Sequence, residues 1–153
     1  MIKTKSSIYF ESKIRREGIL ENGQQAKLNE LYVVDSLSFT ECESRITNYI
    51  AQFSQGEFEV LTEQRAKYKE IFFSDKEDED IFYRVNVTFI TIDEHSCKEK
   101  KTRVSYLVQA NSVQTAKNNV DEVMSQSMSD YKITSVVETN IVDVVDAETA
   151  KEQ

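Results

Sequence analysis

The 153-residue sequence contains no proline, three glycines, two cysteines and one histidine. Without proline, long strands meet no local obstacle. The glycines, Gly18, Gly23 and Gly56, are too few and too scattered to build a Walker A loop, a G-x-G-x-x-G turn or a G-x-S-x-G elbow. The sequence therefore excludes the phosphate-loop enzymes.

Long apolar runs are also missing. No run exceeds a few residues, so no segment is expected to span a membrane, and the first residues, MIKTKSSIYFESK, lack the apolar stretch of a secretory signal. Cys42 and Cys97 have no framework spacing, which favours a reducing cytoplasm. With 39% apolar and 30% charged residues, the composition is typical of a soluble globular protein.

The net charge of −8 falls almost wholly on residues 75–153. Binding DNA by counterion release requires a basic face, and these averages provide none, so generic DNA binding is not expected. Two short cationic segments, SKIRR at 12–16 and KEKKTR at 98–103, still allow a small anionic ligand.

Two stretches follow the same pattern: LYVVDSLSFTECESRI at 31–46, and SYLVQANSVQTAKNNV at 105–120. In each, a β-rich run with Tyr-x-Val precedes a serine, Ser38 or Ser112, and apolar residues then recur at helical spacing. A serine hydroxyl here caps the first helical turn, and Glu41 forms a capping-box pattern with Ser38. The pattern predicts amphipathic helices near residues 38–55 and 112–128.

Strands are predicted on both sides of each helix. SIYFESKIRRE at 7–17 and DIFYRVNVTFITID at 80–93 alternate with period two, which indicates one better-buried face. Further extended segments follow the helices at 57–73 and 132–145. The first also contains LTEQRAKYKEI, which fits a helix, but its match to the second copy favours a strand. Hairpin turns are expected at Asn22-Gly23 and within DEHSCKEKK.

The unit is therefore β-β-α-β, used twice. The predicted fold is α+β: tandem duplicated units forming a mainly antiparallel sheet with two helices on one face, related by a pseudo-twofold axis. Residues 1–146 are expected to form a single domain of two repeats, about 5–73 and 80–146. An acidic connector, 74–80, too charged to pack, joins them, and 147–153 are expected to fray. The open second face favours homo-oligomerisation.

Residues with catalytic or metal-binding chemistry do not converge in the sequence. His95 and Cys97 share one loop, but a metal site needs more ligands, and a nucleophile needs a third, orienting group. Carboxylate pairs such as Glu57 and Glu59 are common on solvated strand faces. We therefore expect no catalytic residue, no metal and no cofactor.

Basic, polar and aromatic side chains on the outward strand faces remain as candidates for a ligand site. Arginine offers a planar fork to a phosphate, and tyrosine offers a flat ring to a base. Keeping the open face soluble is the more common role of such residues. The candidate ligand-binding residues are Tyr9, Lys13 and Arg15 in the first half and Arg84, Asn86 and Thr88 in the second.

Three segments, VVDSLSFTECESRI, FITIDEHSCKEKKTRVSYLVQA and VVETNIVDVV, together resemble a family of small Bacteroidetes and bacteriophage proteins classed as a domain of unknown function. The resemblance covers roughly residues 5–146. It implies a cytoplasmic setting in a bacterial host cell, on a phage or mobile element, and it supplies no catalytic residue.

Three functions stay open. The first is a non-catalytic, phage-encoded binding protein that sequesters a small anionic, nucleotide-type signal of host defence, because a duplicated unit suits a compact ligand. The second is a protein–protein interaction module or inhibitor acting on a host or phage protein. The third, an enzyme of unrecognised type, ranks last for want of a nucleophile, metal site or phosphate loop.

Overall fold

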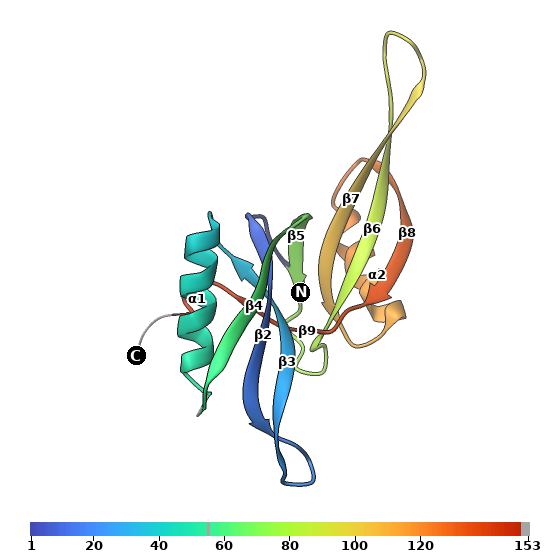
Figure 1. The fold of residues 1–153 in the computed structure, drawn as a ribbon. Helices are drawn as coiled ribbons and strands as arrows, with labels where there is room; N and C mark the ends of the chain where they lie inside the picture. The colour runs from blue at the N-terminus through green and yellow to red at the C-terminus, as the bar shows by residue number, and fades with distance from the viewer. Residues whose placement is uncertain (55, 151–153) are drawn as a thin grey trace. The chain divides into compact units, whose positions relative to one another are not determined.

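The computed structural model describes residues 1–54 and 56–150 (Figure 1). It is an α+β fold with two helices and mixed, mostly antiparallel sheets, which confirms the predicted class. The helices are α1 (Phe39–Ala51) and α2 (Val113–Met124). The strands are β1 (Lys3–Lys5), β2 (Tyr9–Ile19), β3 (Gln25–Asp35), β4 (Phe58–Ala66), β5 (Tyr68–Phe73), β6 (Ile81–Ile92), β7 (Glu99–Ala110), β8 (Asp130–Glu138) and β9 (Ile141–Val145).

The chain divides into two compact units, each with its own sheet. The α1 unit comprises Ser7–Lys67 and Asn140–Gln153, and its sheet has the order β4-β2-β3-β9. The α2 unit comprises Met1–Ser6 and Tyr68–Thr139, and its sheet has the order β1-β5-β7-β6-β8. The prediction of one sheet carrying both helices is therefore wrong, because each helix packs on its own sheet.

Both sheets are built around a long antiparallel hairpin, β2–β3 or β6–β7. The strand after the helix, β4 or β8, pairs antiparallel with the first hairpin strand. A parallel strand, β9 or β5, lies against the second hairpin strand. The described parts of the two sheets thus share one strand arrangement, with β1 added at one edge of the α2 sheet.

Each of the two extended segments predicted after the helices is divided into two strands that join different sheets. The first breaks at Lys67 and the second at Thr139-Asn140, so β5 belongs to the α2 unit and β9 to the α1 unit. At the second break, the backbone amide and the hydroxyl of Thr139 both donate to the carbonyl of Phe82, at 3.0 and 2.7 Å. The chain therefore exchanges a strand between the units in each direction.

Both helices begin at the predicted serines. The Ser38 hydroxyl accepts the Glu41 amide at 3.1 Å, and the Ser112 hydroxyl accepts the Thr115 amide at 3.1 Å. The Glu41 carboxylate reaches back to the amide of Leu37, at 3.0 Å. The helices end earlier than predicted, and Gln55 lies outside the described residues. With 13 and 12 residues, neither described helix is long enough to cross a bilayer.

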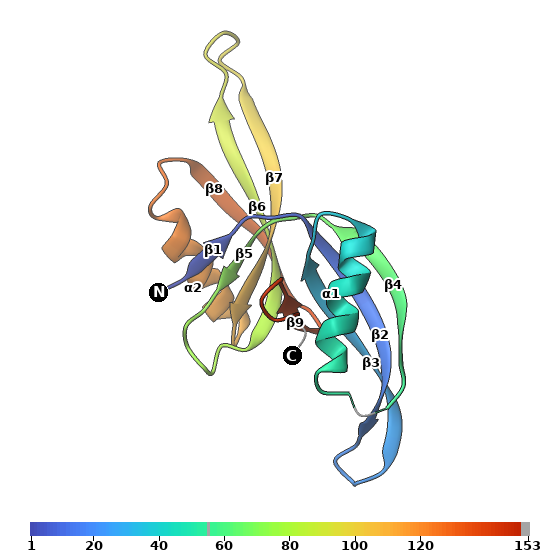
Figure 2. The ribbon, with the colours of Figure 1, turned by 90° about the vertical axis from the view of Figure 1, so that its left-hand side faces the viewer.

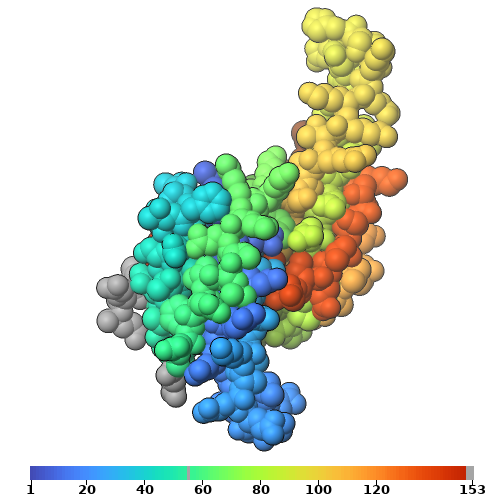
Figure 3. All heavy atoms as spheres, in the orientation of Figure 1, coloured from blue at the N-terminus to red at the C-terminus, as the bar shows by residue number. Residues whose placement is uncertain are grey.

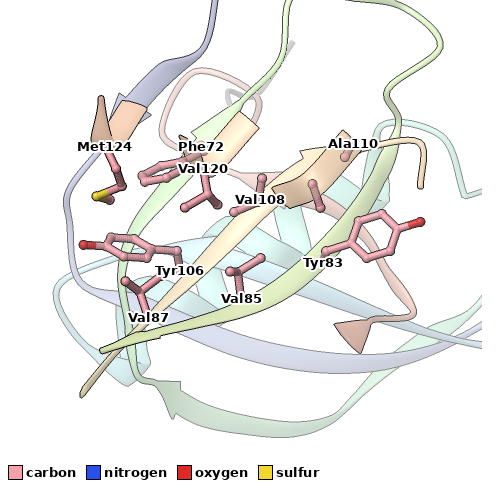
Figure 4. Packing of buried hydrophobic residues seen from close by; sticks show 10 residues of the cluster. Phe72, Tyr83, Val85, Val87, Tyr106, Val108, Ala110, Val120 and Met124 are labelled. Atoms are coloured by element: carbon pink, nitrogen blue, oxygen red, sulfur yellow. The ribbon is translucent and has the colours of Figure 1, made fainter. Parts of the chain in front are cut away.

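The core of each unit lies between its helix and its sheet. Figure 2 shows α1 lying along its sheet, where Cys42, Ile46 and Ile50 pack against buried strand residues such as Phe10 and Ile14. In the α2 unit, Val120 and Met124 face a sheet surface that includes Val85, Val87 and Tyr106 (Figure 4). These inward-facing strand residues follow the predicted period-two pattern.

The acidic segment 74–80 is not wholly solvated, contrary to the prediction. Glu79 is only 2% exposed. Its carboxylate accepts hydrogen bonds from the Ser74 hydroxyl at 2.8 Å and from the Asn119 amide group at 2.9 Å. These bonds offset the cost of burying the charge, and they tie the segment to α2.

The predicted fraying of residues 147–153 is wrong up to Ala150, which is 5% exposed and belongs to the core of the α1 unit. The Asp146 carboxylate accepts the amides of Glu148 and Thr149, at 3.0 and 2.9 Å. This local turn folds the segment back toward the core, and residues 151–153 lie outside the described part of the chain.

Both hairpin turns form where they were expected. Gly23 has a φ of +84°, which favours glycine, and its amide donates to the carbonyl of Leu20 at 2.9 Å. In the β6–β7 hairpin, Cys97 adopts a φ of +58°, and its amide donates to the carbonyl of Asp93 at 2.8 Å. Figure 3 shows the end of this hairpin, in yellow, standing clear of the rest of the α2 unit.

Candidate anion-binding site

The predicted ligand-binding residues are distributed over two sheets. Tyr9, Lys13 and Arg15 lie on β2 in the α1 unit, and Arg84, Asn86 and Thr88 lie on β6 in the α2 unit. Because core residues such as Phe10 and Val87 point toward the helices, their alternating neighbours occupy the opposite faces. Both sets lie on the faces opposite the helices, but Tyr9 and Thr88 are buried there, and the six residues are not members of one sheet surface.

On the α1 sheet, the candidate residues are unavailable or already paired. Tyr9 is 1% exposed, so its ring cannot stack on a ligand from solvent. Arg15 lies opposite Asn29 on β3 and Glu59 on β4. Its Nε donates to Asn29 Oδ1 at 3.1 Å, and its Nη1 lies 3.6 Å from Glu59 Oε1. This face therefore neutralises its own arginine, and of the three candidates only Lys13 is exposed.

A small hollow beside Arg15 has the same mixed character. It measures about 160 Å³. Its lining contains as many carboxylates as cationic side chains, so it offers no net charge to a ligand. The lining residues are Arg15, Arg16, Glu17, Lys27, Glu57, Phe58 and Glu59.

On the α2 sheet, Thr88 has the opposite surroundings. It pairs with Arg103 on β7 and with Lys132 on β8, so the two cationic residues flank it on one face. Lys101 lies two residues before Arg103 on the same face of β7, opposite Ile90. We call Lys101, Arg103 and Lys132 the cationic trio. None of the three side chains forms an ion pair or hydrogen bond with any residue that the structure describes.

Asn86 holds a row of polar groups next to the trio. The Ser105 hydroxyl donates to Asn86 Oδ1 at 2.7 Å, and Asn86 Nδ2 donates to Ser135 Oγ at 2.9 Å. Because Ser105 occupies the amide oxygen, the second Nδ2 hydrogen and the Ser135 hydroxyl hydrogen are left as donors. The row therefore adds hydrogen-bond donors beside three positive charges, which suits a ligand rich in acceptor oxygens.

These groups surround an open hollow of about 540 Å³, which we call the Thr88 hollow. This volume is within the range of small-molecule sites, about 300–1,000 Å³. No carboxylate belongs to its lining. The lining residues are Asn86, Val87, Thr88, Ile90, Lys101, Arg103, Val104, Ser105, Lys132 and Thr134.

Arg84, the remaining candidate, lies outside this lining. Its Nε and Nη2 lie 3.4 and 3.3 Å from the Tyr68 hydroxyl, and its guanidinium carbon is 5.9 Å from the centre of the Tyr68 ring. The structure therefore brings Asn86 and Thr88 together with the cationic trio, which the sequence reasoning missed. The alternation of KEKKTR along a hairpin strand was the signal that could have placed Lys101 and Arg103 on this face.

His95 and Cys97 lie at the end of the β6–β7 hairpin. The His95 amide donates to Asp93 Oδ1 at 2.9 Å, and Cys97 is exposed. Within residues 1–54 and 56–150, no three side chains of His, Cys, Asp or Glu gather in a way that could hold a metal ion.

The fold and the hollow define an α+β protein with an unpaired cationic sheet face. Comparison with family models matches residues 8–147 to the domain of unknown function DUF4494, and the chain belongs to this family. This match confirms the resemblance to a domain of unknown function. Comparisons with curated proteins and with solved structures gave no match.

Proposed function

We propose that the protein is a non-catalytic binding protein for a small anionic, nucleotide-type ligand, held in the Thr88 hollow. One observation carries this proposal: the cationic trio is unpaired in a chain that has 27 acidic and only 19 basic residues. Carboxylates that could neutralise the trio are abundant, yet none lines the hollow. An anionic ligand is the partner that this surface lacks.

Coulomb's law gives the size of the interaction energy expected between the trio and an anion. An anion about 4 Å from one cation gains about 1 kcal/mol in a water-like dielectric and about 4 kcal/mol at an effective dielectric of 20. Arg103 and Lys132 are separated by two strand spacings, about 10 Å between Cα atoms, so one phosphate above Thr88 is within reach of both side chains. The ligand thereby replaces a repulsion between two cations with two attractions.

The proposal includes a tandem duplication followed by divergence of the two copies. The shared strand order and serine caps support the duplication, as does the register of the parallel strands, in which Asp143 lies opposite Tyr32 and Glu70 opposite Tyr106. If the two units are copies, Arg15 and Thr88 occupy equivalent positions in them. One copy surrounds its central residue with neutralising partners and the other with cations, so we assign binding to the α2 unit alone.

The lining supports binding more directly than turnover, because hydroxyl, amide and cationic groups predominate. A phosphate accepts hydrogen bonds from guanidinium, ammonium and hydroxyl groups together. Sequestration of a nucleotide signal of host defence is one function of this class, and a protein that serves it needs affinity without chemistry.

Isothermal titration calorimetry with a panel of linear and cyclic nucleotides tests the proposal. We expect binding by the intact chain, weakened at least tenfold by Arg103→Gln or Lys132→Gln, since charged hydrogen bonds contribute about 1.5–3 kcal/mol each. Lys100→Gln is the matched control, because Lys100 lies on the same strand but alternates to the other face. Absence of binding across the panel, or binding that both variants leave intact, contradicts the proposal.

A protein-binding module is the second candidate, favoured by the end of the β6–β7 hairpin. Ile92 is 69% exposed there, and an exposed apolar side chain on a projecting hairpin can anchor a partner. Under this alternative, Ile92→Lys abolishes capture of a protein partner while leaving nucleotide affinity unchanged. Capture that is equally strong with Ile92→Lys contradicts this use of the hairpin.

A further inference from the structure

We propose that the ligand carries two phosphoryl groups, held in two subsites of the Thr88 hollow. The first subsite lies between Arg103 and Lys132, above Thr88. The second lies beside Lys101, above Ile90. This inference rests on the proposed function and narrows its ligand class from any small anion to a nucleotide with two separate phosphoryl groups.

The spacing of the strand residues separates the two subsites. Arg103 and Lys132 are the register partners of Thr88, so they converge on one point from both sides. Lys101 is two residues away along β7, about 7 Å between Cα atoms, and its register partner is Ile90. A lysine in that row can serve a neighbouring phosphoryl group while the first group occupies the place above Thr88.

Asp130 determines on which side of Ile90 the second group lies. Asp130 is the register partner of Ile90 on β8, so a carboxylate and Lys101 flank Ile90 from opposite sides. A phosphoryl group is repelled by Asp130 and attracted by Lys101. The second subsite therefore lies toward β7, in line with Arg103 along that strand.

The charge of the hollow agrees with two groups. The trio supplies three positive charges, and no lining residue is acidic. One phosphate monoester brings a charge of about −1.5 to −2 at neutral pH, which leaves the hollow positive. A second group brings the summed charge of the lining residues and the ligand close to neutrality, and Asp130 lies outside this lining, on β8.

The volume of the Thr88 hollow limits the size of the part of the ligand that is not phosphate. The hollow measures about 540 Å³, well inside the range of small-molecule sites. Two phosphoryl groups fill only part of that space. The polar row formed by Asn86, Ser105 and Ser135 borders the remainder, where sugar hydroxyls or a base edge find hydrogen-bond donors and acceptors.

Calorimetry with two probes, adenosine 5′-monophosphate and adenosine 3′,5′-bisphosphate, tests the inference. We expect the bisphosphate to bind the intact chain about tenfold more tightly, the scale of one charged hydrogen bond. Lys101→Gln should remove this advantage and leave the affinity for the monophosphate within about twofold. Arg103→Gln should weaken both probes, and Lys100→Gln should change neither.

The outcomes separate this inference from the function on which it rests. If both probes bind equally and both depend on Arg103, the second subsite is overturned and the proposed function stands. If Lys101→Gln weakens the monophosphate as much as the bisphosphate, the two subsites merge into one and the inference fails. If neither probe binds at millimolar concentration, the inference fails, and the proposed function fails with it when no other nucleotide of the panel binds.

Discussion

Arg103 and Lys132 flank Thr88 in the α2 sheet, just as Asn29 and Glu59 flank Arg15 in the α1 sheet. The backbone geometry is shared, but the electrostatics are opposite. Around Arg15, an amide oxygen accepts a hydrogen bond from the central cation at 3.1 Å, and a carboxylate at 3.6 Å neutralises its charge. Around Thr88, two cations face a neutral hydroxyl. Our proposal therefore assigns affinity for an anion to the second arrangement.

The trio should contribute nothing to folding. Arg103→Gln and Lys132→Gln remove mutually repelling, exposed charges, so we expect the free energy of unfolding to stay within about 0.5 kcal/mol of the wild-type value. Urea denaturation followed by circular dichroism measures this difference. A loss above about 1 kcal/mol in either variant would show that the side chain has a structural partner.

Two serines near the start of α1 should respond to the same substitution with opposite signs. Ser36 Oγ is buried and has no strong hydrogen-bond partner among the described residues, because its hydrogen-bonding neighbour is the Cys42 thiol, whose pKa it lowers. Its matching position in the α2 unit is Ala110. Ser36→Ala should therefore be neutral or stabilising, by up to about 1 kcal/mol. Ser38→Ala removes the helix cap and should destabilise by about 1 kcal/mol.

Urea denaturation of the two variants under identical conditions measures the sign of each change in the free energy of unfolding. Equal destabilisation by Ser36→Ala and Ser38→Ala would mean that the Ser36 hydroxyl is hydrogen-bonded in solution, as by a buried water.

The ion pair between Arg16 and Glu30 should show strong coupling. Arg16 Nε and Nη2 donate to the two Glu30 oxygens at 2.5 and 3.3 Å, and both side chains are largely buried. Breaking the pair by Glu30→Val should cost about 3 kcal/mol or more. At the matching positions of the α2 unit, the apolar residues Phe89 and Val104 stand in place of this ion pair.

The double variant Arg16→Phe/Glu30→Val should therefore recover at least half of the loss caused by Glu30→Val alone. A double-mutant cycle based on urea denaturation measures the coupling. Additive losses would contradict the match between these two pairs of positions.

The two cysteines should differ in reactivity. Cys97 is exposed, whereas burial raises the pKa of Cys42 from 9.0 to about 12, and the Glu63 carboxylate adds to the shift. A thiol reagent at pH 8 should label one cysteine per native chain and both after unfolding. In Cys97→Ser, native labelling should disappear. Equal labelling rates for both cysteines would contradict the burial of Cys42.

The raised pKa of Cys42 also makes the stability of the protein depend on pH. The folded state holds Cys42 as a thiol, so its contribution to stability is fully present below pH 9 and is lost as the pH rises toward 12. Cys42→Ala should flatten the stability curve over this interval, measured by denaturation at stepped pH.

The parts of the fold that depend on local sequence were predictable. Ser38 and Ser112 identify both helix starts, because a cap is decided within four residues. The alternation around Phe10 and Val87 likewise identifies the buried strand faces. The exchange of β5 and β9 was not predictable, because the breaks at Lys67 and Thr139 involve pairings with strands distant in the sequence.

The candidate site was only half predictable for the same reason. Asn86 and Thr88 follow from alternation along one strand. Their cationic neighbours come from β7 and β8, and Lys132 reaches Thr88 only because a register shift after Asn86 moves the pairing by one residue. Glu79 was missed because its partners, Ser74 and Asn119, give a carboxylate a buried place that composition cannot reveal.

The most direct test of the central claim is the calorimetric affinity of Arg103→Gln for a nucleotide, compared with Lys100→Gln and the intact chain. We expect Arg103→Gln to bind at least tenfold more weakly, while Lys100→Gln binds like the intact chain. Equal affinities for the two variants would contradict the account, because they would show that the charge on the Thr88 face holds no ligand.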